Sequence, residues 1–87
     1  MIKKEIVISN ESGLESKAAA RLIQKASCYE ANVWIQKGER KANAKSLLGV
    51  LSLGISKGEK VLLIADGNDE KIALHELEMF ANRGMTD

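Results

Sequence analysis

Residue types that define whole classes of proteins are scarce in this sequence. Aromatic residues make up only 3% of the 87 residues, so there is no platform on which nucleic-acid bases could stack. The formal net charge is only +1, so the chain also lacks the excess of clustered Lys and Arg that binds a phosphate backbone. We therefore expect no direct nucleic-acid partner.

Cysteine and long apolar segments are scarce as well. Cys28 is the only cysteine, so no internal disulfide can form, which agrees with a reducing compartment, and we expect its thiol to be packed or half-packed. The longest apolar stretch, residues 61–65, is far too short to span a bilayer. The lysines near the N-terminus are not followed by the apolar segment of a secretory signal. The expected location is the cytoplasm, without a membrane partner.

The length and the remaining composition indicate one small globular domain, residues 1–87. Hydrophobic residues at 45% and charged residues at 29% are ordinary for such a domain, and a chain this short has room for one modest core. His75 has no cysteine or second histidine at ligand spacing, so we expect it to face solvent. Neither a metal ion nor a cofactor is expected.

The pattern of apolar residues predicts seven elements in the order strand, helix, strand, strand, helix, strand, helix. The expected ranges are a strand over 2–9, a helix over 16–27, a strand over 31–36, a turn over 37–40 into a short third strand, a helix over 46–54, a strand over 60–66, and a helix that begins at Asp69, is capped by Asp69 or Asn68 and ends near Gly84. Helices between strands favour an antiparallel or mixed sheet with the helices on one face, an α+β fold of two layers.

The short second helix is apolar on almost every side. At about 100° per residue, its apolar side chains spread nearly all the way round the axis. These residues are Leu47, Leu48, Val50, Leu51 and Leu53. One sheet cannot cover them all, so two interpretations remain open: part of the helix is exposed as a docking patch, or the helix is sunk between the sheet and the third helix.

Two polar residues stand where helices are expected to start. Ser46 can cap its helix with a hydrogen bond worth about 1 kcal/mol, or it can be a phosphorylation site. Ser12 followed three residues later by Glu15 matches a capping box, which would place Glu15 in the first helical turn. A catalytic role for Glu15 has less support, because no second acid or metal-ligand cluster stands near it in the sequence.

The segment Asn43–Leu53, NAKSLLGVLSL, resembles the regulatory-serine segment of the HPr family, the small phosphocarrier proteins of the bacterial sugar phosphotransferase system. The family pattern is Lys-Ser-Ile-Met-Gly-Val-Met-Ser-Leu, and the order of elements agrees over essentially the whole chain. The resemblance implies a four-stranded antiparallel sheet covered on one face by three helices, an open-faced sandwich of order βαββαβα. It also implies that Ser46 is phosphorylated by the ATP-dependent HPr kinase/phosphorylase and that the adjoining apolar helix docks onto partners.

The family's other motif, Gly-(Ile/Leu)-His-Ala-Arg-Pro-Ala, corresponds to residues 13–19, GLESKAA. Glu15 stands where the family has its phosphorylated histidine, Lys17 replaces the arginine and Ala18 replaces the proline. A neutral imidazole nitrogen accepts a phosphoryl group and passes it on, whereas a glutamate is already anionic and would have to form an acyl phosphate. The departure therefore implies that ordinary phosphoryl relay from enzyme I is lost.

In this respect the chain is similar to the Crh branch of the family, in which glutamine replaces the histidine and the serine is retained. Proteins of that branch act in carbon catabolite repression, where the serine-phosphorylated form binds catabolite control protein A. By resemblance, Ser46 supplies the phosphate and Lys17 the charge contact that arginine makes in relatives. The apolar contact comes from Leu47, Leu48 and Leu51. Lysine lacks the bidentate fork of arginine, so we expect a weaker contact or a different partner.

Three functions remain open at this point. The first is a non-enzymatic regulator phosphorylated on Ser46, the second a phosphocarrier that uses Glu15 or another acceptor, and the third an interaction module that uses residues 47–53 without phosphorylation. A further hypothesis is that the fixed charge of Glu15 partly imitates a phosphorylated histidine. The expected state is a monomer, or a homodimer formed by strand exchange as in Crh-type relatives.

Overall fold

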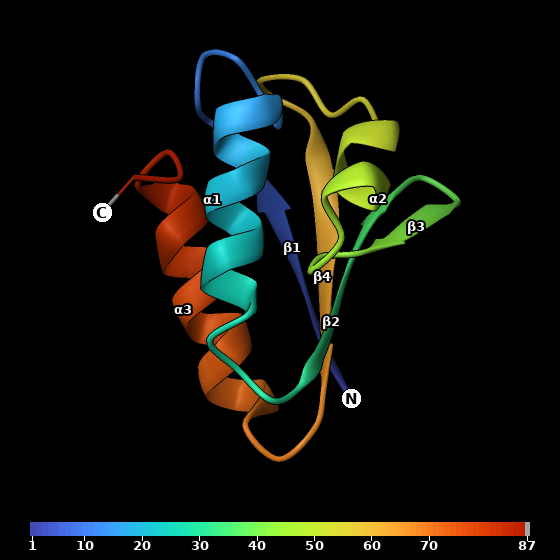
Figure 1. Cartoon of the computed structure of the whole chain (residues 1–87), viewed down its shortest axis with the longest axis vertical. Helices are drawn as coiled ribbons and strands as arrows, with labels where there is room; N and C mark the ends of the chain where they lie inside the picture. The colour runs from blue at the N-terminus through green and yellow to red at the C-terminus, as the bar shows by residue number, and fades with distance from the viewer. Residues whose placement is uncertain (87) are drawn as a thin grey trace.

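The computed structural model describes residues 1–86, and its seven elements follow one another in the predicted order (Figure 1). Their bounds are β1 (Ile2–Val7), α1 (Ser16–Ala26), β2 (Asn32–Lys37), β3 (Arg40–Asn43), α2 (Leu47–Ser52), β4 (Lys60–Asp66) and α3 (Glu70–Asn82). The strand predicted over 60–66 matches β4 residue for residue, and the ends of the other elements lie close to their predicted places.

The four strands form one sheet in the order β1-β4-β2-β3, and every neighbouring pair is antiparallel. β1 and β2 both run antiparallel to β4, so they are parallel to each other, and α1 carries the chain between them over one face of the sheet. This crossover leaves a slot between β1 and β2 that β4 fills. Of the two sheet types left open by the sequence, the fully antiparallel one is therefore correct.

One face of the sheet forms the core with the helices, and the other face is open. Because side chains alternate along a strand, the register that pairs Ile6 with Val61 and Ile35 with Leu63 turns all four toward the helices, where they are buried. On the opposite face Trp34 is only half-buried, and the Lys41 ammonium lies 5.4 Å from the centre of its ring. The fold is therefore an open-faced α+β sandwich.

α1 and α3 lie side by side on the covered face (Figure 1). α1 turns a row of small side chains and Leu22 toward the core, so it can lie close to its neighbours. The buried residues of α3 are Ala73, Leu74, Leu77, Phe80 and Ala81. α2 packs against α1 and β3, where it lies to one side of the main helical pair.

Asp69 occupies the predicted N-cap position of α3, but its side chain does not cap the helix. Its backbone (φ −104°, ψ 25°) is not in the extended conformation typical of a capping side chain. Instead the carboxylate accepts hydrogen bonds from the backbone N–H groups of Glu30 and Ala31, each at 2.8 Å. These bonds, the one from Glu30 foremost, hold the pKa of Asp69 below its usual value. Asp69 thus ties the start of α3 to the loop before β2.

The expected burial of Cys28 is wrong, because this side chain is exposed. α1 ends at Ala26, and the chain has already left the helix one residue past the C-cap Ser27, so Cys28 no longer follows the buried stripe. Its thiol donates a weak hydrogen bond to the carbonyl oxygen of Gln24 at 3.5 Å. His75 is exposed on α3, as its surroundings in the sequence predicted.

Candidate functional site

Glu15 stands at the mouth of α1 as its N-cap residue, with an extended backbone (φ −92°, ψ −176°) and an exposed side chain that makes no cap hydrogen bond. The predicted capping box is therefore wrong, since the helix begins at Ser16 and Ser12 lies well before it. Gly13 supplies the reason: its φ of +64° interrupts any helical path between Ser12 and Glu15. The carboxylate of Glu15 is left facing solvent.

The loop that carries Glu15 is held against the loop that follows α2. The N–H of Gly13 donates to the carbonyl oxygen of Asn10 at 3.0 Å, and the N–H of Leu14 donates to that of Ile55 at 2.9 Å. A Cβ atom on Gly13 would overlap the same Ile55 oxygen and would lie 2.8 Å from the Cα of Ser56. Backbone therefore meets backbone here, and the mouth of α1 has a set position relative to the end of α2.

Glu15 and Leu51 line a common hollow of about 560 Å³ between these two loops. Glu11 and Lys57 line it as well and form an ion pair across 2.8 Å. This hydrogen-bonded ammonium holds the pKa of Glu11 below its ordinary value. Two motifs that are far apart in the sequence, the altered histidine motif and the leucine-rich helix, thus share one surface.

Lys17 is exposed in the first turn of α1, and no carboxylate of residues 1–86 forms an ion pair with its ammonium. The first intrahelical hydrogen bond runs from the N–H of Ala19 to the carbonyl oxygen of Glu15 at 2.7 Å. The N–H groups of Ser16, Lys17 and Ala18 therefore have no partner inside the helix. The helix mouth offers hydrogen-bond donors and one positive charge beside the Glu15 carboxylate.

Ser46 is the N-cap residue of α2, as one of its two interpretations predicted. Its Oγ accepts a hydrogen bond from the N–H of Gly49 at 3.2 Å, and its own N–H donates to the carbonyl oxygen of Asn43 at 3.0 Å. The side chain is half-buried. Capping leaves the hydroxyl proton free to donate elsewhere, so the geometry is compatible with the second interpretation too.

α2 exposes three of its leucines, which we call the leucine patch: Leu47, Leu48 and Leu51. Leu48 is 81% exposed, Leu47 44% and Leu51 36%, whereas Val50 and Leu53 are buried beneath the helix. The helix is therefore not sunk between the sheet and the third helix, and part of it is exposed. The physical reason is that α2 lies beside α1 and β3 and not between the sheet and α3, so only one side of it is covered.

Two cations of the β2–β3 hairpin hold the C-terminal end of α2, a role that their place in a predicted turn does not indicate. Lys37 donates to the carbonyl oxygen of Gly54 at 2.9 Å and pairs with Glu59 at 2.9 Å, while Arg40 donates to that of Ser52 at 2.9 Å. Basic side chains often satisfy the last carbonyls of a helix, which is the signal that could have identified them. The pKa of Glu59 is lowered by the N–H of Ser56 and then by Lys37.

Within residues 1–86, no three His, Cys, Asp or Glu side chains are grouped closely enough to hold a metal ion. In the same part of the chain, no helix has the length and apolar character needed to cross a membrane.

Comparison with known proteins places this arrangement in a family. The family model for the phosphorylation site of the HPr component of the phosphotransferase system (PTS) matches residues 2–83. The chain belongs to the HPr family. It is 35% identical to the HPr-like protein Crh of Halalkalibacterium halodurans over 83 residues, which cover 95% of this chain and 99% of that protein. It is also 37% identical to the phosphocarrier protein HPr of Xylella fastidiosa strain 9a5c, over 95% of this chain and 94% of that protein.

Solved structures of HPr-family proteins confirm the expected fold. The crystal structure of HPr-C-His from Thermoanaerobacter tengcongensis superposes with a TM-score of 0.94 at 36% identity, covering 100% of this chain and 99% of that one. A crystal structure of Bacillus subtilis Crh, described as a domain-swapped dimer, matches with a TM-score of 0.78 at 33% identity and covers all of both chains. The chain is about equally identical to a Crh protein and to an HPr protein, so the choice between their two roles depends on the residues at its own site.

Proposed function

We propose that this HPr-family chain is a non-enzymatic regulator of the Crh type, switched by phosphorylation of Ser46 and acting through the leucine patch. The observation that carries the proposal is the exposure of three leucines directly after a serine hydroxyl at the start of the same helix. One phosphoryl group added there changes the charge at the edge of the apolar patch and hence its choice of partner. The proposed setting is carbon catabolite repression in the cytoplasm.

In the proposed modification, HPr kinase/phosphorylase transfers the γ-phosphoryl group of ATP to the Oγ of Ser46. The new Oγ–P bond forms as the bond between phosphorus and the ADP oxygen breaks, and the hydroxyl proton passes to a base of the kinase. Within the described residues, Ser46 Oγ takes part in one hydrogen bond, from Gly49 at 3.2 Å, which is long for a bond to a hydroxyl oxygen. The product carries up to about two negative charges and three strong acceptor oxygens.

The proposed partner is catabolite control protein A or a regulator of similar chemistry. Its complementary surface would present cations to the Ser46 phosphate, an apolar pocket to the leucine patch and a carboxylate or other acceptor to Lys17. Lys17 offers a point charge without the planar fork of arginine, so it adds attraction but little geometric selectivity. The leucines supply most of the apolar area that the complex would bury.

The phosphorylation step is tested by incubating the chain with HPr kinase/phosphorylase and ATP and measuring its intact mass. Wild type is expected to gain the mass of one phosphoryl group, and Ser46→Ala is expected to gain none. Ser52→Ala is the matched control, because it removes a serine hydroxyl from the other end of α2 and should still be modified. An unmodified wild type, or equal modification of Ser46→Ala, contradicts the proposal.

The docking step is tested with a charge placed in the leucine patch. Leu48→Asp is expected to weaken binding of the phosphorylated chain to the regulator at least tenfold, a loss of about 1.4 kcal/mol, because a desolvated carboxylate replaces an apolar contact. Ile72→Asp is the matched control, since Ile72 is a 57% exposed apolar residue on α3, away from the patch. Equal weakening by both variants would mean that the patch is not the docking surface.

Two further results distinguish the two alternatives. An interaction module without phosphorylation predicts that Leu48→Asp abolishes binding while Ser46→Ala binds as well as wild type. A phosphocarrier predicts that phosphoenolpyruvate and enzyme I label the chain, with a hydroxylamine-sensitive adduct on Glu15. That alternative draws support from the phosphocarrier HPr relative, whereas the replacement of the histidine and of the neighbouring arginine stands against it.

A more specific form of the proposal concerns Glu15, whose carboxylate would partly imitate the charge of a phosphorylated histidine. It lies exposed at the helix mouth and shares a hollow with Leu51 of the patch, so its charge is close to the docking surface. Glu15→Gln keeps the size and removes the charge, and it is expected to change partner affinity. Affinity that stays the same in this variant would remove the imitation hypothesis and leave the role of Ser46 intact.

We also propose that the chain forms a homodimer, because it is similar in structure to a Crh protein that was crystallised as a dimer. Light scattering coupled to size exclusion tests it across a range of protein concentrations. A mass of one chain at every concentration would establish the monomer.

A further inference from the structure

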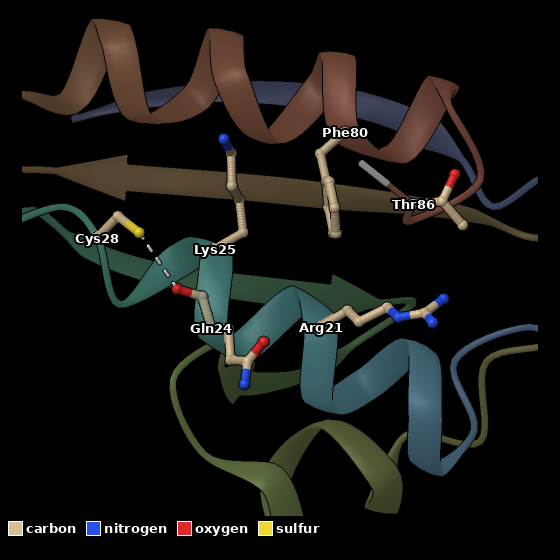
Figure 2. A pocket seen from close by; sticks show the side chains of 6 residues that line it. All are labelled: Arg21, Gln24, Lys25, Cys28, Phe80 and Thr86. Carbon is tan, nitrogen blue, oxygen red and sulfur yellow. Dashed lines mark hydrogen bonds between the residues drawn. The ribbon is translucent and has the colours of Figure 1, made fainter.

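β1 is an edge strand of the sheet, because the order β1-β4-β2-β3 gives it a neighbour on one side only. Figure 2 looks at the pocket of about 560 Å³ between α1 and α3, and it shows β1 as the outermost strand, behind α3. Within residues 1–86 no other strand pairs with the outer edge of β1. An unpaired strand edge can accept a strand of another chain.

The backbone groups on this outer edge belong to the odd-numbered residues of β1. Ile8, which directly follows the strand, donates its N–H to the carbonyl oxygen of Glu59 at 3.0 Å, on the side of β4. Backbone N–H and C=O groups alternate in direction along an antiparallel strand, so those of Lys3, Glu5 and Val7 point away from β4. These are the groups to which a second strand would bond.

The side chains of the same residues lie on the open face of the sheet. Ile6 is buried under the helices, so the odd-numbered side chains lie on the opposite face, where Lys3, Glu5 and Val7 are exposed. Val7 is 46% exposed, and Met1, just before the strand, is 65% exposed. Glu5 forms no ion pair with any Lys or Arg, all of which lie within residues 1–86, and Lys3 forms none with a carboxylate of those residues.

The order of these side chains is self-complementary in one antiparallel register. When two copies of β1 lie antiparallel with Lys3 opposite Glu5, a two-fold axis produces that pair of opposite charges twice. The same register sets the apolar side chains of Met1 and Val7 opposite each other, also twice. A shift by two residues in either direction sets Lys3 opposite Lys3 or Glu5 opposite Glu5, and like charges directly opposite are destabilising.

On the covered face this register brings the Lys4 side chains of the two copies together. Each Lys4 ammonium lies 3.5 Å from the carboxylate of Glu78 in its own chain, so the two positive charges are balanced. The other edge strand of the sheet offers no such match. β3 carries Arg40 and Lys41 and no acidic residue, so two copies of it would bring only like charges together.

We propose that two copies of this chain associate through the outer edges of β1, antiparallel, with Lys3 of each copy opposite Glu5 of the other. This inference names the contact of the homodimer proposed above and rests on that proposal, but it does not depend on phosphorylation of Ser46. Each β1 stays paired with its own β4, so the arrangement differs from an exchange of strands between chains. The contact is smaller than a standard interface, so we expect a weak dimer with a dissociation constant in the micromolar range.

The leucine patch stays free in this dimer. α2 packs against α1 and β3, and β3 is at the edge of the sheet opposite β1. The dimer therefore presents two Ser46 hydroxyls and two leucine patches, one on each copy. A partner that is itself a two-fold dimer could bind both.

Reversal of the charges of Lys3 and Glu5 tests the register by ¹H–¹⁵N NMR from micromolar to millimolar concentration. In wild type the amides of residues 2–7 should shift with concentration. Lys3→Glu and Glu5→Lys each set like charges opposite at two places, so each should weaken self-association about fivefold or more. A ¹⁵N-labelled Lys3→Glu chain should bind unlabelled Glu5→Lys about as tightly as wild type binds itself, because both cross pairs again join opposite charges. Regained affinity also shows that both variants fold.

Lys41→Glu is the matched control, because it makes the same change of charge at an exposed position on the other edge strand and should associate as wild type does. A mixture that binds no more tightly than its separate variants, or equal weakening by Lys41→Glu, would overturn the proposed contact. A dimer that persists in Lys3→Glu but is lost in Leu48→Asp would overturn it too and leave the homodimer in place. A wild type that is monomeric at millimolar concentration would overturn both the contact and the homodimer, whereas the mass measurement on Ser46 stands apart from either result.

Discussion

Gly13→Ala is expected to reduce the free energy of unfolding by about 2 to 5 kcal/mol, because two separate penalties fall on this position. The backbone has a φ of +64°, where a residue with a Cβ is disfavoured by about 1–2 kcal/mol. The new Cβ would also overlap the carbonyl oxygen of Ile55, which now accepts the 2.9 Å hydrogen bond from Leu14. Loss of that hydrogen bond would leave the N–H of Leu14 and the carbonyl oxygen of Ile55 without a partner, which adds about 1–3 kcal/mol.

Gly38→Ala separates the two penalties. Gly38 also has a positive φ, at +60°, but a Cβ there would meet nothing within 4 Å. Its replacement is expected to reduce the free energy of unfolding by only about 1–2 kcal/mol, the backbone part alone. The difference between the two variants measures the contact of the loop before α1 with the loop after α2.

Urea unfolding followed by circular dichroism measures both variants, with linear extrapolation to water. For a domain of this size 1 kcal/mol lowers the melting temperature by roughly 4–8 °C, so Gly13→Ala should melt at least about 8 °C below wild type. A loss for Gly13→Ala no larger than that for Gly38→Ala would refute the reasoning. The two loops would then not be in the direct backbone contact from which the shared surface of Glu15 and Leu51 is derived.

Three further predictions concern stability. Because the pKa of Asp69 is lowered in the folded state, its contribution to stability is present above the unfolded pKa of about 3.9 and is lost as the pH falls through the folded pKa. Unfolding curves from pH 7 to pH 2 should therefore show that wild type loses free energy of unfolding more steeply than Asp69→Asn does. Equal slopes would contradict this. Ala18→Pro should change the free energy of unfolding by less than about 1 kcal/mol, because the N–H at position 18 has no intrahelical partner. Ala20→Pro lies inside the same helix and should reduce the free energy of unfolding by about 3 kcal/mol. Similar losses for the two variants would show that the start of the helix is misplaced. Leu77→Ala leaves a cavity at a fully buried position and should reduce the free energy of unfolding by about 2–5 kcal/mol in the same assay. Leu48→Ala, on the surface, should reduce it by less than about 0.5 kcal/mol. A small loss for Leu77→Ala would count against the described core.

The features that depend only on nearby residues along the chain could be predicted from the sequence. The continuous apolar run of β4 and the helical spacing of the apolar residues in α3 identify both elements, because each pattern follows from the geometry of the element itself, whatever packs against it. The cap of α2 was readable for the same reason, since Ser46 meets the N–H of a residue only three positions away. The replacement of histidine by Glu15 is likewise a fact of the sequence alone.

The failures occur where a distant segment decides the outcome. The capping box at Ser12 and Glu15 has the right spacing, but the contact of Gly13 with Ile55 imposes a backbone that excludes it. Asp69 has the right position for a cap, yet its carboxylate bonds to Glu30 and Ala31, N–H donors supplied by another loop.

By itself the sequence determined the order of the elements, the apolar residues that form the core and the absence of the relay imidazole, because these follow from residue type and spacing. Only the tertiary structure decided which side of α2 stays exposed, that Glu15 and Leu51 share one hollow, and that side chains of α1 and α3 line one pocket. Exposure and proximity are properties of the whole packed chain. They depend on backbone contacts between segments such as Gly13 and Ile55 whose separation along the chain gives no sign that they meet.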